Sequence, residues 1–266
     1  MNAAPAAPQP IGRVVDDAIK LYRASFRACW PINAVAAVIV AASAMHLTLK
    51  LSSLGVVGGR STADTMAMYR MPVLYLTYLF DALVKLAAGG AVVVCQYALA
   101  TGLGLPRTMQ SVGIMLRRFP KAALAASGAL IMVLIASLIL LFPGIYVAGT
   151  LSVWTVALFA EDKGPGQSLS ESMRLVNRNW WRTCTIMTIA VVLMTVFSGL
   201  ATLIAGSLIA FWHSSLLAVQ LSLQLTGAVA YVFTLSMLPA AQVALYLDLK
   251  LRREGGDLAE RLGALA

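Results

Sequence analysis

A chain of 266 residues of which 60% are hydrophobic and 12% are charged is far more apolar than a globular domain, in which about 45 to 50% of residues are apolar and about 25% are charged. This composition excludes an ordinary soluble fold and predicts an all-α polytopic membrane protein. The net charge of +9 is explained by membrane topology and attraction to anionic lipid, so no nucleic-acid partner is expected.

The chain begins with ten residues rich in alanine and proline, which we expect to be a flexible N-terminus without a cleavable export signal. The next stretch, to residue 30, has apolar and charged side chains on opposite faces at helical spacing, which predicts an amphipathic helix lying in the membrane surface. Apolar runs of about 20 residues, enough to cross a hydrocarbon core of about 30 Å, then follow. The sequence contains six such runs, at about residues 31–50, 76–103, 122–142, 145–160, 183–205 and 225–248.

Three stretches of the chain need a separate interpretation. Pro143 and Gly144 predict a tight turn at membrane depth, so that the third and fourth runs form a hairpin. Residues 206–224 are apolar but carry several Ser and Gln, and we interpret them as an interfacial or re-entrant stretch. Residues 250–266 are predicted to be a tail outside the membrane.

Basic residues flank the six runs unevenly. Four Lys or Arg lie in each of the four flanks on one side, whereas the other side has only Lys50, Arg60 and Arg70. Because cytoplasmic flanks are enriched in Lys and Arg, both termini are predicted to be cytoplasmic.

The three cytoplasmic stretches before the odd-numbered runs share a pattern. Each starts at a proline (Pro10, Pro106 and Pro165), and a leucine, an arginine and an aromatic residue follow in that order before the span. This predicts three parallel repeats, each an in-plane helix and two spans, around a pseudo-threefold axis. Alternatively, such loops are basic and amphipathic without any repetition. Within a single six-span domain at 11–249, the repeats would cover about 11–103, 106–160 and 165–249.

The third of these stretches also carries a helix-start signal. Ser168 and Glu171 have the S-x-x-E spacing of a capping box. Leu169, Met173 and Val176 form an apolar stripe, which predicts that this helix too lies in the membrane surface.

Two charges, Asp81 and Lys85, interrupt the apolar stretch at 74–94. If they lie near the external headgroups, both side chains can reach water and form only a weak i, i+4 pair. If they lie deep, they face the helix bundle beside Gly89 and Gly90, where another helix can approach closely. The shallow placement is favoured, and the pair is a candidate intramembrane polar site. Further candidates for a polar path are Gln96, Gln224 and Gln242.

The ends of the runs supply candidate membrane anchors. Trp30, Trp180 and Trp181 are predicted to lie at the level of the lipid headgroups. Glu161 and Asp162 end the fourth run and are candidates to pair with nearby arginines. Basic side chains at the same ends are candidates to bind anionic lipid headgroups or a partner; they are Arg23, Arg117, Arg118, Arg178, Arg182, Lys250, Arg252 and Arg253.

Signs of catalytic or metal chemistry are weak. Cys29, Cys95 and Cys184 are too scattered for a disulfide framework, and no C-x-x-C occurs. The two histidines, His46 and His213, belong to no H-E-x-x-H pair, and no G-x-S-x-G motif is present. The sequence GVVGG at 55–59 lacks the Lys-Ser/Thr ending of a phosphate loop. We therefore expect no catalytic residue, metal or cofactor.

The last run ends MLPAAQVALYLDLKLRREGGDLAERL, which resembles the terminal signature of the bacterial glycerophosphoryl diester phosphodiesterase membrane domain family. The segments IGRVVDDAIKLYRASF, FPGIYV and GPGQSLSESMRLVNRNWWR are similar to the same family. One departure is Gly256, where the family has a large aromatic residue before the aspartate. The resemblance covers nearly the whole chain, and it implies a six-span protein of the bacterial inner membrane without the soluble catalytic barrel of some relatives.

Two classes of function are compatible with these features. The first is a non-catalytic scaffold or envelope-maintenance factor that acts through lipids, self-association or another membrane protein. The alternative is a transporter or channel for a small solute or lipid, with a polar path among the six helices.

Overall fold

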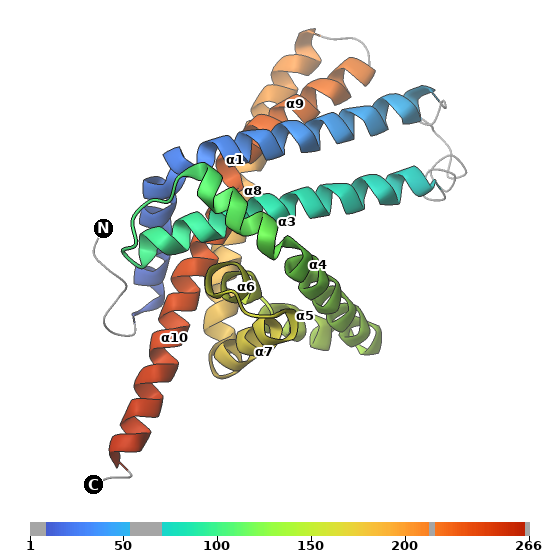
Figure 1. Cartoon of the computed structure of the whole chain (residues 1–266). Helices are drawn as coiled ribbons and strands as arrows, with labels where there is room; N and C mark the ends of the chain where they lie inside the picture. The colour runs from blue at the N-terminus through green and yellow to red at the C-terminus, as the bar shows by residue number, and fades with distance from the viewer. Residues whose placement is uncertain (1–8, 54–70, 213–215, 264–266) are drawn as a thin grey trace. The chain divides into compact units, whose positions relative to one another are not determined.

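The computed structural model describes residues 9–53, 71–212 and 216–263, and within these ranges every regular element is a helix. The predicted all-α fold is confirmed. Most of the predicted N-terminal segment, the GVVGG stretch and His213 lie outside the described residues. The helices, labelled in Figure 1, are α1 (Ile11–Ser53), α3 (Pro72–Ala100), α4 (Thr108–Ile139), α5 (Leu141–Thr150), α6 (Trp154–Glu161), α7 (Pro165–Val176), the 3₁₀ helix η1 (Asn177–Asn179), α8 (Trp180–Trp212), α9 (Leu216–Thr234) and α10 (Met237–Gly263).

Six helical stretches are long and apolar enough to cross a membrane, and the protein is a multi-pass membrane protein. In two of them, Thr108–Ile139 and Pro165–Ser207, only 11% and 6% of the apolar 18-residue segment is buried inside the protein. In water so large an exposed apolar surface would be a liability. Against lipid tails, which are as apolar as leucine, it carries no such cost.

The chain divides into two compact units. Unit 1 contains residues 1–29, 89–192 and 236–266, and unit 2 contains residues 30–88 and 193–235. The three predicted repeats stay a prediction.

Two of the predicted in-plane helices are continuous with the spans that follow them. α1 runs through Pro31 and α4 through Pro120 without interruption. Proline is tolerated inside spanning helices because neighbouring groups satisfy the backbone that it frees. The tail residues after 249 likewise continue α10 as far as Gly263.

The turn between the third and fourth spans lies at Leu140 and not at Pro143–Gly144. Leu140 is extended (φ −161°, ψ 151°), and the two predicted turn residues lie in the first turn of α5, where proline costs no hydrogen bond. Gly144 has another role, because a Cβ there would lie 2.0 Å from the Ser137 hydroxyl oxygen. The sequence Pro-Gly therefore permits close packing of α5 on α4.

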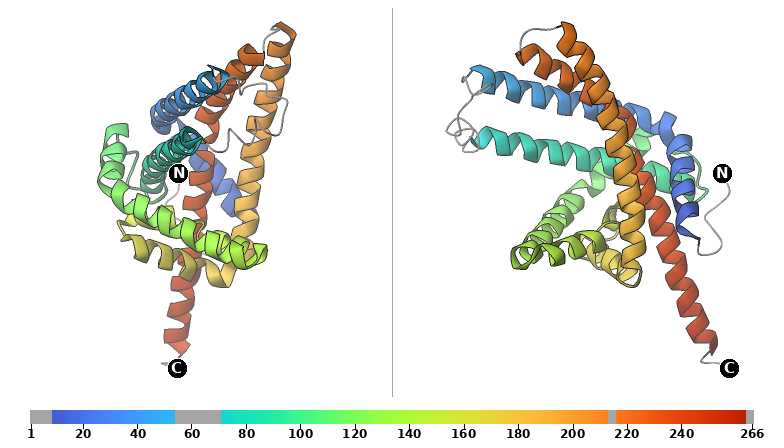
Figure 2. Two further views of the ribbon diagram at one scale, coloured as in Figure 1. Left: turned by 90° about the vertical axis from the view of Figure 1, so that its right-hand side faces the viewer. Right: turned by 180° about the vertical axis from the view of Figure 1, so that it is seen from behind.

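Residues 206–224 do not form a separate re-entrant element in the described part of the chain. Residues 206–212 continue α8 and residues 216–224 begin α9, and both views of the ribbon show these two segments side by side (Figures 1 and 2). A Cβ on Gly206 would lie 2.9 Å from Leu223. The small residue thus lets α8 and α9 approach closely within unit 2.

In unit 1, α4, α5, α6 and α7 pack on one another, and α10 contacts α6 and α7 (Figure 2). α7 begins at Pro165, three residues before the predicted capping box, and the Gly164 N–H donates to the Gln167 side chain at 3.3 Å. Leu169 and Val176 of its apolar stripe are buried. The stripe faces protein, which differs from the predicted membrane-surface position.

Candidate functional site

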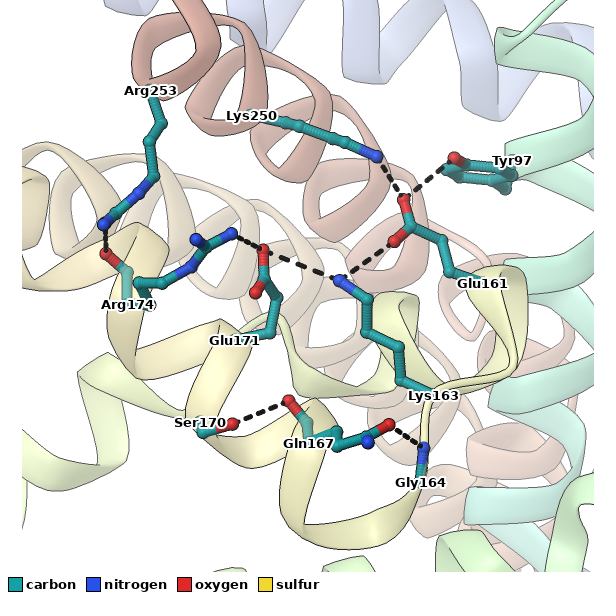
Figure 3. Close-up of polar contacts among 10 residues, drawn as sticks. All are labelled: Tyr97, Glu161, Lys163, Gly164, Gln167, Ser170, Glu171, Arg174, Lys250 and Arg253. Carbon is teal, nitrogen blue, oxygen red and sulfur yellow. Dashed lines mark hydrogen bonds and ion pairs between the residues drawn. The ribbon is translucent and has the colours of Figure 1, made fainter. Parts of the chain in front are cut away.

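The acidic residue that ends α6, Glu161, is the centre of a charged cluster in unit 1 (Figure 3). Its carboxylate accepts hydrogen bonds from Lys250 Nζ at 2.8 Å and from the Tyr97 hydroxyl at 3.2 Å. Lys163 Nζ lies 3.1 Å from the second carboxylate oxygen. One carboxylate thereby joins the end of α3, the end of α6 and the middle of α10.

The backbone at Asp162 sets the direction in which the chain leaves α6. Its φ of 55° is left-handed, a conformation that aspartate tolerates better than most residues. The Asp162 carboxylate lies 3.4 Å from Arg118 Nε and 3.1 Å from Lys121 Nζ of α4. The Arg118 guanidinium also donates to the Phe159 carbonyl at 2.5 Å. The end of α6 is therefore fastened to α4.

A second carboxylate of the cluster, Glu171, comes from α7. It lies 2.8 Å from the Arg174 guanidinium and 3.6 Å from Lys163 Nζ, so Lys163 is shared between Glu161 and Glu171. The Arg253 guanidinium of α10 donates to the Arg174 carbonyl at 2.7 Å (Figure 3). These contacts connect α7 to α10.

Among the carboxylates of unit 1 that the structure describes, Asp248 of α10 is the most deeply buried, at 1% exposed. Arg182 of α8 and Arg252 one turn later in α10 both lie 3.0 Å from it, and the Gln9 N–H donates to it at 2.9 Å. Both guanidinium groups also donate to the Gln9 carbonyl. The residues just before α1 are thereby fixed between α8 and α10.

The predicted basic contact residues fall into two groups. Arg23, Arg117 and Arg178 are exposed, and they make no ion pair within the described residues. The other five contact protein groups: Arg118, Arg182, Lys250 and Arg252 pair with carboxylates, and Arg253 bonds a carbonyl. Lipid or partner binding stays a prediction for all eight.

The three tryptophans predicted as anchors have different surroundings. Trp30 and Trp181 are 49% and 79% exposed, as an interfacial position requires. Trp180 stacks on Tyr146 with ring centroids 5.5 Å apart and donates its indole N–H to the Tyr146 carbonyl at 3.1 Å. It therefore also fixes the start of α8 against α5.

The three glutamines proposed for a polar path each bond one helix to another. In unit 1, Gln96 donates to Ser25 at 3.1 Å and to the Ser236 carbonyl at 3.0 Å. Gln242 of α10 accepts from the Thr155 hydroxyl of α6 at 3.3 Å and donates to the Ser152 carbonyl, in the turn before α6, at 2.9 Å. In unit 2, Gln224 donates to the Thr48 hydroxyl at 2.6 Å. Their side-chain nitrogens serve helix packing.

The candidate intramembrane pair is not formed. Asp81 is 8% exposed and lies 2.5 Å from the Ser43 hydroxyl of α1, whereas Lys85 is exposed and no ion pair within 4 Å joins the two. Their depth in the membrane stays a prediction.

Several residues of these contacts were missed in the sequence. Gln9 acts through its backbone, for which no sequence signal exists. Tyr97 and Ser43 are single polar residues whose partners lie 64 and 38 residues away along the chain. Lys163 pairs with acids close to it in sequence, Glu161 and Glu171. Within the described ranges, no three His, Cys, Asp or Glu side chains come together as a metal site would require.

Comparisons with known proteins add one match. A family model described as a domain of unknown function, DUF7847, matches residues 31–249. No curated protein and no solved structure matches the chain.

Proposed function

The chain belongs to the DUF7847 family, a domain of unknown function, and we propose that it is a non-catalytic scaffold or envelope-maintenance factor of the bacterial inner membrane. In this proposal it acts through anionic lipids or through a partner, which can be another copy of the chain or a different membrane protein. Both termini are cytoplasmic. The resemblance to the glycerophosphoryl diester phosphodiesterase membrane domain family supports the bacterial inner membrane as its location.

The observation that carries this proposal is the distribution of charge in unit 1. Each of the four carboxylates Glu161, Asp162, Glu171 and Asp248 lies within 4 Å of two basic side chains. The acids are thus neutralised within the protein, and their role is to hold helix ends together. Arg23, Arg117 and Arg178 are exposed and form no ion pair among the described residues, and such charge attracts anionic headgroups at about 1 kcal/mol per residue.

Native mass spectrometry of the purified protein tests the lipid proposal. Arg23, Arg117 and Arg178 are replaced together by Gln, and a matched triple variant replaces Lys50, Arg60 and Arg70 on the predicted external side. At about 1 kcal/mol each, the first variant should lose at least about tenfold in retention of phosphatidylglycerol or cardiolipin, while the second retains the wild-type level. Equal lipid retention by the wild type and both triple variants would contradict the lipid proposal.

Transport is a second candidate, favoured by buried polar atoms in unit 2. The Gln224 side-chain oxygen and the Tyr231 hydroxyl are buried without a hydrogen-bond partner within the described residues, and polar groups inside a membrane commonly line solute paths. Flux of ions and small solutes into proteoliposomes separates the candidates. If the protein is a scaffold, proteoliposomes that contain it should leak no faster than protein-free liposomes. Faster flux that the Asp81→Asn variant abolishes would establish transport.

A further inference from the structure

The loop between α3 and α4 and the first part of α4 expose large apolar side chains of unit 1. The exposed fractions are 81% for Leu103, 51% for Leu105, 82% for Met109 and 61% for Leu116. Single exposed apolar residues are normal on any protein. Several large ones gathered in one short segment mark a contact with a membrane or with another protein.

The turn that ends α3 leaves Leu103 outside. The Leu103 N–H donates to the Ala98 carbonyl at 2.9 Å, and the Gly102 N–H donates to the Leu99 carbonyl at 3.3 Å. Gly102 is left-handed, with a φ of 79°. These features make up a Schellman motif, in which an apolar residue at the position of Leu103 frequently packs back on its own helix. Here that side chain is exposed instead, so the turn presents it to the surroundings.

The exposed apolar side chains of α4 form one stripe that continues into the spanning part of the helix. Met109 and Leu116 are seven residues, or about two helical turns, apart and so share a face, whereas the buried Ser111 and Met115 lie on the opposite face. Further along the stripe the helix exposes Leu124, Ile131 and Leu138. That part of α4 meets lipid tails, because only 11% of its apolar 18-residue segment is buried inside the protein. The exposed start of α4 is therefore continuous with a lipid-facing surface.

The charge of this segment favours anionic lipid as the contact. Residues 101–121 contain four basic side chains and no acidic one. Two of the four pair with Asp162 at the end of α6. The other two, Arg107 and Arg117, are exposed and form no ion pair within the described residues. A helix with basic residues beside an apolar stripe lies at the boundary between headgroups and acyl chains. A leaflet that contains anionic lipid offers phosphates to the arginines and acyl chains to the apolar side chains.

We propose that residues 101–117 are a lipid-inserting segment of unit 1. The four exposed apolar side chains of the segment enter the acyl-chain boundary of the leaflet, and Arg107 and Arg117 bind the phosphates of anionic headgroups above it. This inference rests on the proposed lipid-binding function, and it names the segment through which unit 1 enters the leaflet.

Spin labelling of the full chain in liposomes of phosphatidylethanolamine and phosphatidylglycerol tests the insertion. Single cysteines replace Leu103 or Met109 in a background without the three native cysteines. Power saturation then compares collisions of the label with oxygen, which concentrates in the bilayer, and with a nickel chelate, which stays in water. Both labels should collide more with oxygen, as Ile131→Cys on the lipid-facing stripe should. The exposed Ser170→Cys of α7 is the matched control and should collide more with the nickel chelate.

Two results would overturn the insertion. One is a collision ratio like that of Ser170→Cys at both loop and helix positions, which would place the segment in water. The other is shielding of both labels from oxygen and from nickel, because a protein would then cover the segment. Lipid retention by the triple arginine variant is measured separately. If that retention falls as expected while the labels lie in water, the insertion fails and the proposed lipid binding stands.

A second measurement uses the chain without substitutions, so it does not depend on the variants folding. Phosphatidylglycerol that carries a photoreactive diazirine close to its headgroup is added to the liposomes, and peptide mass spectrometry locates the adducts after illumination. We expect adducts within residues 101–117 and none within α7. Adducts elsewhere in the chain with none in 101–117 would contradict the assignment.

Discussion

Arg182 and Asp248 illustrate how a single buried charge depends on its partners. Removing a carboxylate and a guanidinium from water costs several kcal/mol per ion, and only good geometry and further hydrogen bonds offset that cost. Asp248 has both, because two guanidinium groups and one backbone N–H surround it. Loss of one partner leaves the carboxylate buried and only half compensated.

Arg182→Gln should therefore lower stability by about 2 kcal/mol, below the roughly 3 to 5 kcal/mol of a fully broken buried pair, because Arg252 remains. Arg178→Gln is the matched control, since this exposed arginine makes no ion pair within the described residues. Its effect should stay within about 0.5 kcal/mol. Thermal unfolding in detergent, followed by a thiol-reactive dye that labels the buried Cys29 and Cys95, measures both. Equal shifts of the two variants would contradict the role given to Asp248.

At the scale of elements, the packing of α3 on α6 in unit 1 depends on one glycine. Phe159 of α6 is completely buried, and a Cβ on Gly90 would lie 2.5 Å from its ring. The ring fills the place that a side chain at position 90 would need. Small residues at such positions let spanning helices approach closely.

Gly90→Ala should destabilise the protein by about 1 to 3 kcal/mol, as overpacking does in a filled interior. Gly89→Ala is the control, because nothing lies within 4 Å of its Cβ position. There the better helix propensity of alanine should leave stability unchanged or raise it by up to about 1 kcal/mol. Unfolding temperatures of the two variants in the same detergent measure the difference. Gly90→Ala should have the lower unfolding temperature of the two, and the opposite order would contradict the packing of Phe159 against Gly90.

At the level of helices, local features could be predicted from the sequence, whereas features that depend on contacts between distant residues could not. Apolar runs identify the six spanning helices because length and hydropathy are local properties. The turn at Leu140 was missed because Pro143 and Gly144 are strong turn residues whose use here depends on contact with Ser137. The apolar stripe of α7 predicts a lipid-facing position, but amphipathicity alone does not say whether an apolar face meets lipid or protein. The i, i+4 spacing of Asp81 and Lys85 suggested a local pair, whereas the partner of Asp81 lies 38 residues away along the chain.

At the scale of the whole molecule, the two units use polar groups differently. In the described residues, all ion pairs lie in unit 1. Unit 2 joins its helices by contacts such as the Asn33 amide to the Val232 carbonyl and Gln224 to Thr48. Charged networks suit helix ends near water, whereas hydrogen bonds between neutral groups suit helices inside lipid. In the proposed orientation, the ion pairs and exposed arginines of unit 1 meet the anionic cytoplasmic leaflet.

Orientation is the claim on which lipid binding by unit 1 depends, and cysteine labelling in spheroplasts tests it most directly. Single cysteines replace Ser61 or Gly256 in a background without Cys29, Cys95 and Cys184, and an impermeant maleimide is added to intact or permeabilised spheroplasts. With both termini cytoplasmic, Ser61→Cys should react in intact spheroplasts, whereas Gly256→Cys should react only after permeabilisation. The reverse pattern would place the basic flanks outside the cell and contradict the account.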